Sequence, residues 1–354
     1  MVNKKDKNRF IPSVAIPPGE TIKENMKFLG MNQKELAARL DITPKHLSNI
    51  INGNAPITYD TALKLERVIG PSADFWMNLE TNYQLTKARL EEQKKFELDL
   101  EILKDIPYKE MSKFGWVKET KNRAERVINC RNFFGVAELS SIKNAYDVAF
   151  RTHKQIKKIS NFGILAWIRK AELEGLNVKV KKFNKRKLEK LIPVFRGLTL
   201  KQPDEFYPEM KELCAQCGVA LVLVPYLPRT YICGATIWRK NKAILALSLK
   251  GKRADIFWFT FFHELSHLIN HSDEKLHISY ENEADDLASD YLIPEELYKY
   301  FIDRYNYKDK NQIINYSLEN GIAPFILLGR LQHNRLIEFR HYHDLMPYYE
   351  ITYH

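Results

Sequence analysis

Hydrophobic residues are spaced along most of the chain as in amphipathic helices, and over one short stretch as in β-strands. Apolar positions recur every three or four residues from residue 21 to about residue 85, and a long, highly charged helical pattern covers residues 75–106. Residues 110–200 continue the helical pattern. Strand patterns occur only after Gly218, in VALVLVPYL, GATIWR and KAILALSL, and helical patterns then continue to the C-terminus. The chain is therefore predicted to be α+β and mainly α.

The changes of pattern divide the chain into four predicted segments. A length of 354 residues allows two or three domains, each with its own core. Residues 1–19, with prolines at positions 12, 17 and 18, are predicted to be a flexible arm, and residues 20–86 an all-helical bundle. Residues 87–194 are then a helical connector, and residues 195–354 an α+β domain.

Two short helices joined by a tight turn are predicted inside the first bundle. Asn32 is a suitable N-cap, and Glu35 completes a capping-box-like pair with it. Thr43 caps the second helix, and Pro44 occupies its first turn. The second helix would expose Lys45, His46, Ser48 and Asn49, in a geometry that fits the major groove of DNA. A bundle with a merely hydrated polar face fits the same pattern, so the residues alone leave both interpretations open.

Residues 17–86 resemble the HigA-type branch of the Xre-family antitoxin repressors over their whole length, including the trailing FWMNLETNYQL. The resemblance implies a helix-turn-helix domain that binds operator DNA as a homodimer. It implies that Gln33 and Asn54 contact phosphate groups. The residues implied for reading the bases are Thr43, Lys45, His46 and Asn49.

One of the most apolar stretches of the chain, FWFTFFHELSHLIN, carries two histidines and a glutamate in its middle. His263 and His267 are four residues apart, so both project from one face of a helix and can bind one zinc ion. Glu264 can then act as the general base toward the attacking water. The alternative is a buried helix with hydrogen-bonded histidines. A third ligand would decide against it, and the periodicity of SYENEADDLASDYLIP leaves four candidates: Glu281, Glu283, Asp285 and Asp286.

FWFTFFHELSHLINH followed by ENEADDLASDYLIP resembles the ImmA/IrrE family of metallopeptidases. CGVALVLVPYLPRTYICGATIW and GIAPFILLGRLQH extend the resemblance to roughly residues 195–340. It implies a zincin-like fold with Glu264 as the catalytic residue and Glu283 as the third ligand, eleven residues before Pro294. Ser266 stands where this family usually has glycine, a change that a helix accommodates. The zinc ligands are thus expected to be His263, His267 and Glu283.

Composition and charge indicate a cytoplasmic protein with a basic central region. Hydrophobic residues make up 45% of the chain, which is typical of a globular protein, but no apolar run reaches the roughly 18 residues of a membrane span. Four cysteines do not make a disulfide framework, and no secretory signal is evident. The net charge of +11 is concentrated centrally, in RTHKQIKK and KVKKFNKRK. Such runs are solvated surfaces, or they extend a phosphate-contacting surface.

These observations predict a DNA-binding regulator with a zinc-dependent, site-specific endopeptidase domain that cleaves a regulatory protein. An Xre-type repressor is the expected substrate class, and Tyr231 and His277 are candidate donors to an oxyanion. The alternative is a non-proteolytic HigA-like antitoxin and operator repressor, whose zincin-like domain binds a cognate toxin or senses a ligand. In both cases the expected partners are operator DNA and a second copy of the chain, and no membrane.

Overall fold

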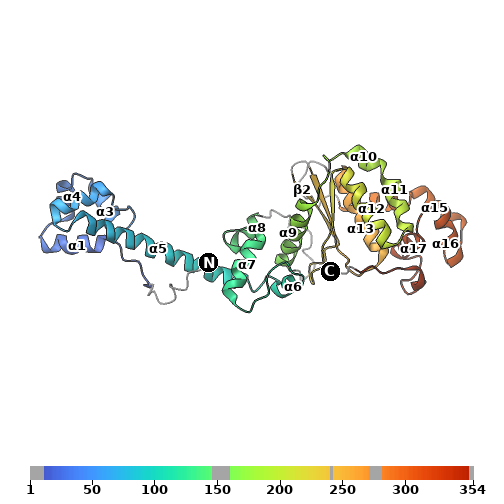
Figure 1. The fold of residues 1–354 in the computed structure, drawn as a ribbon, viewed down its shortest axis with the longest axis horizontal. Coiled ribbons are helices and arrows are strands. Elements are labelled where there is room, and N and C mark those ends of the chain that lie inside the picture. The colour runs from blue at the N-terminus through green and yellow to red at the C-terminus, as the bar shows by residue number, and fades with distance from the viewer. Residues whose placement is uncertain (1–11, 146–159, 240–241, 271–280, 351–354) are drawn as a thin grey trace. The chain divides into compact units, whose positions relative to one another are not determined.

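The computed structural model describes residues 12–145, 160–239, 242–270 and 281–350 (Figure 1). The chain divides into two compact units, Met1–Asp99 and Leu100–His354, called unit 1 and unit 2 below. Both units are dominated by helices, and the strands of the described segments belong to unit 2. None of the helices in these segments has the length and apolar content needed to cross a membrane.

Unit 1 is a bundle of short helices followed by a long one, as the sequence predicts. Its helices are α1 (Gly19–Phe28), α2 (Gln33–Arg39), α3 (Pro44–Ile51), α4 (Tyr59–Ile69) and α5 (Ala73–Ile102), whose last turn passes the boundary at Asp99. The caps form as expected, since Asn32 accepts a hydrogen bond from the Glu35 amide at 2.9 Å and Thr43 one from the His46 amide at 3.1 Å. The core between the helices contains fully buried aliphatic side chains and Trp76. Residues 1–11 of the predicted arm lie outside the described residues.

A buried carboxylate fixes the loop between α3 and α4 to α5. Glu80 is only 7% exposed, and its Oε2 accepts a hydrogen bond from the backbone N–H of Ile57 at 3.1 Å. Its Oε1 accepts a second hydrogen bond from Gln84 Nε2 at 2.7 Å. This carboxylate therefore provides the partner of a buried backbone donor that no helix satisfies.

Replacing Glu80 by alanine is expected to lower the free energy of unfolding of unit 1 by about 1–3 kcal/mol, because the buried Ile57 amide loses its acceptor. Hydrogen exchange at the Ile57 amide should become faster, and the urea midpoint followed by circular dichroism should fall. The exposed Glu91 on the same helix provides the matched control, and Glu91→Ala should change neither measurement. Equal exchange rates in the two variants would contradict this role of Glu80.

Unit 2 consists of helices that precede and follow a small sheet along the chain. Its helices before the sheet are α6 (Tyr108–Lys113), α7 (Arg123–Phe134), α8 (Ile142–Ala145), α9 (Asn161–Asn177), α10 (Lys185–Lys190), α11 (Ile192–Gly197) and α12 (Pro203–Gln216). The strands are β1 (Val219–Leu223), β2 (Gly234–Arg239) and β3 (Lys242–Leu247). The helices after the sheet are α13 (Ala254–Asn270), α14 (Glu281–Leu292), α15 (Glu295–Arg304), α16 (Lys310–Glu319) and α17 (Pro324–His333). The mainly helical α+β architecture predicted from the pattern is confirmed.

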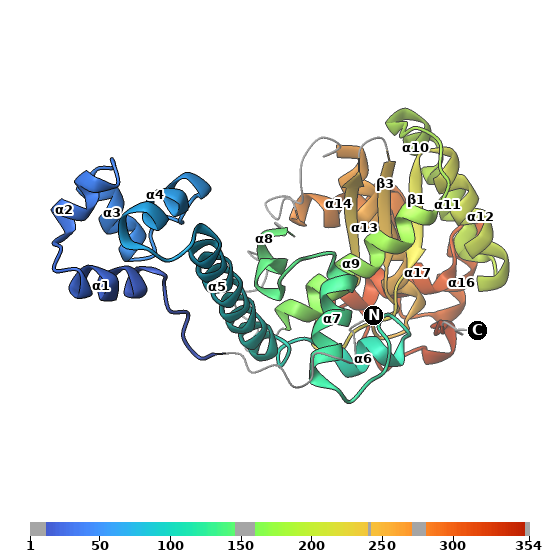
Figure 2. The same ribbon diagram turned by 60° about the vertical axis from the view of Figure 1, so that its left-hand side comes forward.

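The sheet has the order β1–β3–β2 and lies between two layers of helices. β1 pairs with β3 in parallel, with Val219 opposite Ala243, and β2 pairs with β3 in antiparallel orientation, with Gly234 opposite Leu247. α9 packs on one face of the sheet, and α12 and α13 pack on the other (Figures 1 and 2). The apolar side chains between these layers form the core of the unit, which includes the fully buried Trp258.

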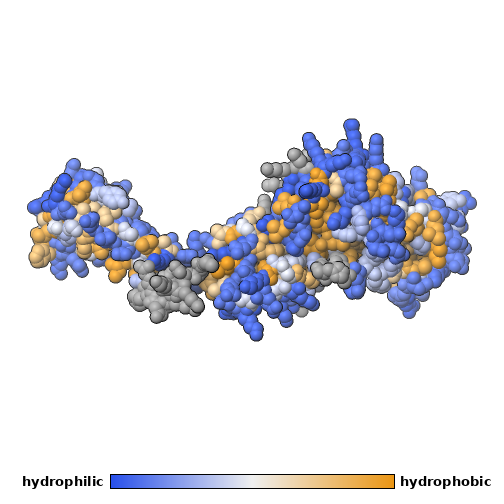
Figure 3. All heavy atoms as spheres, in the orientation of Figure 1, coloured by the Kyte–Doolittle hydropathy of each residue, from blue (hydrophilic) through white to orange (hydrophobic). Residues whose placement is uncertain are grey.

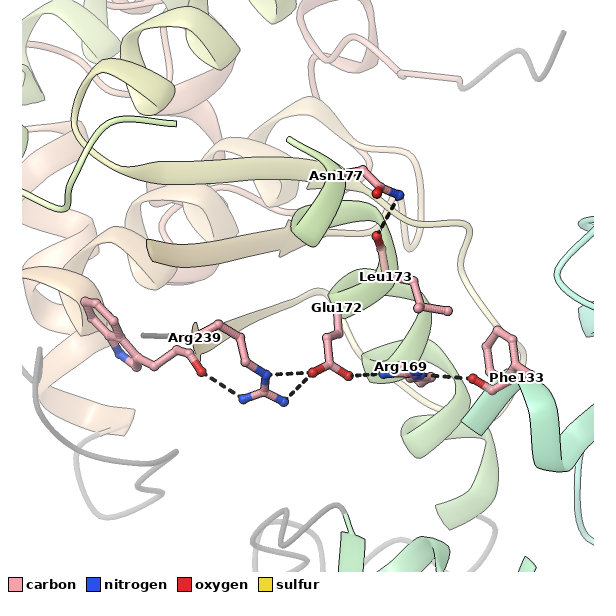
Figure 4. A network of polar contacts seen from close by, with 7 residues as sticks. Phe133, Arg169, Glu172, Leu173, Asn177 and Arg239 are labelled. Carbon is pink, nitrogen blue, oxygen red and sulfur yellow. Dashed lines mark hydrogen bonds and ion pairs between the residues drawn. The ribbon is translucent and has the colours of Figure 1, made fainter. Parts of the chain in front are cut away.

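The helix α9 belongs to unit 2, although the sequence places it in the predicted connector of residues 87–194. Gly175 of α9 approaches the sheet so closely that a Cβ there would lie 2.4 Å from a side-chain carbon of Ile244. The buried carboxylate of Glu172 accepts hydrogen bonds from Arg169 Nη1 at 2.7 Å and from Arg239 Nε of β2 at 2.6 Å (Figure 4). Arg169 Nε also donates to the carbonyl oxygen of Phe133 in α7 at 2.9 Å. These contacts join α7, α9 and β2 into one body.

Candidate functional site

The residues with predicted DNA contacts gather on α2, α3 and the loop that follows α3. A four-residue turn joins α2 to α3, and Asp41 within it has a φ of 52°. α3 buries its apolar side in the bundle through Leu47, Ile50 and Ile51. Its opposite side is polar, with Lys45 exposed and His46 and Asn49 partly exposed. Among the residues that the structure describes, this side is therefore at least partly exposed and can face a ligand.

The other predicted DNA contacts lie at the ends of these helices. Gln33 occupies the first position of α2, where backbone N–H groups are available to a phosphate. The Thr43 hydroxyl oxygen accepts the cap bond from His46, and its hydrogen can still donate to a base or a phosphate. Asn54 is exposed in the loop after α3, and its backbone N–H donates to the backbone carbonyl of Asn49 at 2.8 Å. The two ends of α3 are thus fixed by a side-chain cap and a backbone hydrogen bond, while Thr43 and Asn54 are exposed.

The second group of candidate residues lies on α13, in the core of unit 2. The helix buries most of its side chains, including Phe261, Phe262 and Leu265. His263 and His267 are partly buried, and their Nε2 atoms lie 3.1 Å apart, with the ring planes at 80°. Two nitrogens bound to one zinc ion at about 2.0–2.1 Å in tetrahedral geometry lie roughly 3.3 Å apart. The distance between the two Nε2 atoms therefore suits either a hydrogen bond between the rings or a shared metal ion.

Asp285 of α14 orients the first histidine. Its Oδ1 lies 2.8 Å from His263 Nδ1. An ionised carboxylate only accepts hydrogen bonds, so this contact favours the form of His263 that carries a proton on Nδ1. Sequence reasoning considered Asp285 only as a possible metal ligand. Its neighbour Ala284 is buried against α13 and sets the turn of α14 that brings this carboxylate to the histidine.

Glu264, the residue after His263 on α13, is held by the edge strand β2. It is 7% exposed, and the Thr236 hydroxyl donates to its Oε2 at 2.8 Å. Gly234 approaches the same carboxylate, since a Cβ added there would lie 2.9 Å from Oε1. Sequence reasoning did not identify Thr236, because strand periodicity marks it as inward-facing without naming its partner. The position of the carboxylate is therefore fixed by its contacts with β2.

Glu283, the predicted third ligand, is exposed on α14. The contact described between α14 and the histidine pair is made by Asp285, and Glu283 lies on the other side of the buried Ala284. Within the described residues, no three His, Cys, Asp or Glu side chains are close enough together to hold a metal ion. The structure thus places the Nε2 atoms of His263 and His267 3.1 Å apart, and the metal site with Glu283 stays a prediction.

Tyr231, His277 and the cysteines Cys214 and Cys217 add little to the description of the site. Tyr231, a candidate oxyanion donor, has a φ of 57° and is 42% exposed, and Lys250 Nζ lies 5.0 Å from its ring centroid. His277 lies outside the described residues. Cys214 and Cys217 are buried, and desolvation raises the pKa of both thiols, so they are protonated at neutral pH.

Comparison with known proteins identifies unit 1. A helix-turn-helix family profile matches residues 22–76. The chain is 38% identical over 80 residues to virulence-associated protein I of Dichelobacter nodosus, which covers 22% of this chain and 74% of that protein. It is 35% identical over 71 residues to the HTH-type transcriptional regulator YddM of Escherichia coli strain K12, covering 20% of this chain and 76% of that protein.

Two further relatives are named as antitoxins or antidotes. Antitoxin HigA-1 of Vibrio cholerae is 33% identical over 81 residues, which are 22% of this chain and 76% of that protein. A solved structure of a HigA-family addiction module antidote protein from Coxiella burnetii is 38% identical and covers 23% of this chain and 91% of that chain, with a TM-score of 0.22. The helix pair α2–α3 and these sequence matches agree, and the chain belongs to the helix-turn-helix family of DNA-binding transcriptional regulators, with its DNA-binding domain in unit 1.

Proposed function

We propose that the chain is a HigA-type operator-binding repressor that reads DNA through α3 as a homodimer. The observation that carries this proposal is the structure of α3. Its outward side is polar, its other side is buried, and its N-terminus is capped. A recognition helix needs this combination, since its side chains must reach base edges while its backbone stays fixed. Thr43, Lys45, His46 and Asn49 would read bases, and Gln33 and Asn54 would contact phosphates.

We further propose that unit 2 is a zinc-dependent endopeptidase of the ImmA/IrrE type that cleaves a regulatory protein, with Xre-type repressors as the substrate class. The 3.1 Å separation of the two Nε2 atoms supports this proposal most strongly. The 2.8 Å contact between His263 Nδ1 and Asp285 Oδ1 adds to it, because ligand histidines characteristically donate their other ring N–H to an acceptor. In this proposal His263, His267 and Glu283 hold the ion, since the carboxylate of Asp285 already contacts His263 Nδ1.

The chain's own residues would then carry the proton transfers of peptide hydrolysis. When bound, zinc supplies a Lewis acid that polarises the scissile carbonyl and acidifies water. Glu264 takes a proton from the attacking water and delivers it to the leaving amine. The Thr236 hydroxyl keeps the carboxylate in position during both transfers, since it donates to Oε2.

Purified protein is expected to contain about one zinc ion per chain, and His263→Ala should lose it, because one of three protein ligands is removed. Asp285→Asn should keep zinc with an affinity reduced by about 10–100-fold, the usual effect of altering a partner of a ligand histidine. Metal content by mass spectrometry and competition with a chelator measure both effects. His333→Ala, which changes an exposed histidine of α17, is the control. Full zinc occupancy in His263→Ala would overturn the ligand assignment.

A second candidate function is favoured by the similarity to antitoxin HigA-1. In this case the chain is a non-proteolytic antitoxin and repressor, and unit 2 binds a cognate toxin or senses a ligand. The two functions differ in what they require of Glu264. A peptidase needs its carboxylate as a base, whereas toxin neutralisation does not.

A further inference from the structure

Six exposed cations lie on one continuous segment of unit 2, between the end of α9 and the end of α10. We call this segment the cationic strip, and its members are Lys179, Lys181, Lys182, Lys185, Arg186 and Lys190. Hydrophilic side chains project from the surface over α10 in the space-filling view (Figures 1 and 3). These residues lie in unit 2, outside the DNA-binding domain of unit 1, so the proposed operator recognition gives them no role.

The backbone that displays the strip is firmly attached to unit 2. The amide of Lys181 donates to the Ala215 carbonyl at 3.0 Å, and the amide of Asn184 donates to the Cys217 carbonyl at 2.9 Å. Phe183 packs edge-on against Trp238 of β2, with ring centroids 4.8 Å apart. The cations therefore extend from a fixed frame, so a ligand would not have to order the backbone of this segment.

Few acidic groups neutralise the strip. Lys185 lies 4.0 Å from Glu189, and over residues 12–145, 160–239, 242–270 and 281–350 no other member of the strip has an ion pair. Two neighbouring cations are used differently. Arg239 is paired with the buried Glu172, and Lys242 Nζ donates to three carbonyls at the C-terminal end of α9, with distances of 2.8–3.0 Å. Arg239 and Lys242 thus have partners inside unit 2, whereas the strip's cations other than Lys185 have no ion pair among the described residues.

We propose that the cationic strip binds phosphate groups of DNA and gives the protein a second, sequence-independent contact in addition to that of its helix-turn-helix domain, an inference that rests on the proposed operator binding. Lys and Arg side chains that neutralise phosphates release condensed counterions, which strengthens binding to any DNA sequence. Unit 1 holds DNA at a high effective concentration for the rest of the same chain. The strip can therefore strengthen DNA binding without recognising any particular base sequence.

DNA fits the strip better than a membrane surface does. An interfacial segment pairs its basic side with an apolar side that enters the bilayer. Here Leu188 is fully buried and Phe183 packs against Trp238, so these two apolar residues of the segment pack inside unit 2. The charges remain at the surface, which suits a backbone of phosphates.

The test compares two triple variants of the full chain with equal loss of charge. Lys179→Ala/Lys181→Ala/Lys182→Ala changes the strip, and Lys299→Ala/Arg304→Ala/Lys308→Ala changes exposed cations of α15 and the loop after it. Fluorescence anisotropy over a range of salt concentrations measures affinity for the duplex upstream of the chain's own gene and for a mixed-sequence duplex. Because the strip variant has three fewer cations to neutralise phosphates, its slope of log K against log salt should become about 2.7 less steep. The control variant should keep the slope of the parent protein.

Equal slopes for the parent and the strip variant on both duplexes would overturn the inference. It would also be overturned if the strip variant lost binding to phosphatidylserine vesicles and kept its DNA slope, since the strip would then serve a membrane. Failure of the proposed operator binding would give a different result in the same measurements. The parent protein would not prefer the upstream duplex, while the contribution of the strip would still be measured on the mixed-sequence duplex.

Discussion

Lys45→Ala/Asn49→Ala is expected to remove the preference of the protein for its operator over unrelated DNA. Each good contact between a side chain and a base edge contributes about 1–3 kcal/mol of discrimination, so the two substitutions together correspond to roughly 2–6 kcal/mol. Both side chains lie on the outward side of α3, and the buried side of the helix, with Leu47, Ile50 and Ile51, is unchanged. The fold should therefore persist while the recognition disappears.

The measurement is the ratio of affinities for operator and mixed-sequence DNA at one fixed salt concentration. Lys27→Ala/Asn82→Ala replaces an exposed lysine of α1 and an exposed asparagine of α5 and should leave this ratio unchanged. An unchanged ratio in the α3 variant would remove this helix from the recognition role. A parallel loss of affinity for both DNAs, with the ratio preserved, would assign Lys45 and Asn49 to phosphate contacts instead.

Local features of the fold could be predicted from the sequence because they depend on neighbouring residues. The caps at Asn32 and Thr43 join each side chain to an amide three residues away, so the residue types alone indicate them. The three strand patterns correspond to β1, β2 and β3, since each is a short apolar run between turn residues. The pairing of His263 and His267 follows from the helical repeat in the same way.

Features that depend on distant contacts could not be predicted in this way. The apolar periodicity of α9 shows that one side is buried, but not that it packs on the sheet and thus belongs to unit 2. The hydrogen bond from Thr236 to Glu264 joins residues 28 positions apart, and the contact of His263 with Asp285 joins residues 22 positions apart. Helical and strand periods carry no information about such partners. The site's supporting groups therefore required the structure.

The polar network in Figure 4 gives these distant contacts a functional consequence under the proposed mechanism. Arg239 ends the strand that carries Thr236, and it is bound to Glu172 of α9. Glu172 in turn binds Arg169, which reaches the α7 carbonyl of Phe133. The helices before the sheet thus help to fix β2, and β2 holds the carboxylate that would act as the base.

Glu264→Gln is expected to abolish cleavage of the target regulator while zinc content and operator binding stay at the level of the parent protein. Glutamine keeps the size of the side chain and an oxygen that can accept the Thr236 hydrogen bond, so the fold of β2 and α13 should not change. It cannot take a proton from water, and loss of a general base typically reduces a rate by about 10²–10⁴-fold. Purified protein would be incubated with each product of the neighbouring genes, and intact mass spectrometry would detect cleavage.

Thr236→Val provides a graded comparison for this result, because it keeps the carboxylate and removes its hydroxyl donor. Cleavage by this variant should fall between that of the parent protein and that of Glu264→Gln, since the base remains present but loses its fixed position. A non-proteolytic antitoxin predicts a different pattern, in which both variants repress transcription and neutralise a toxin as the parent protein does. Cleavage by Glu264→Gln at the parental rate would refute the assignment of the base, whereas loss of cleavage together with loss of zinc would mean that Glu264 is itself a ligand.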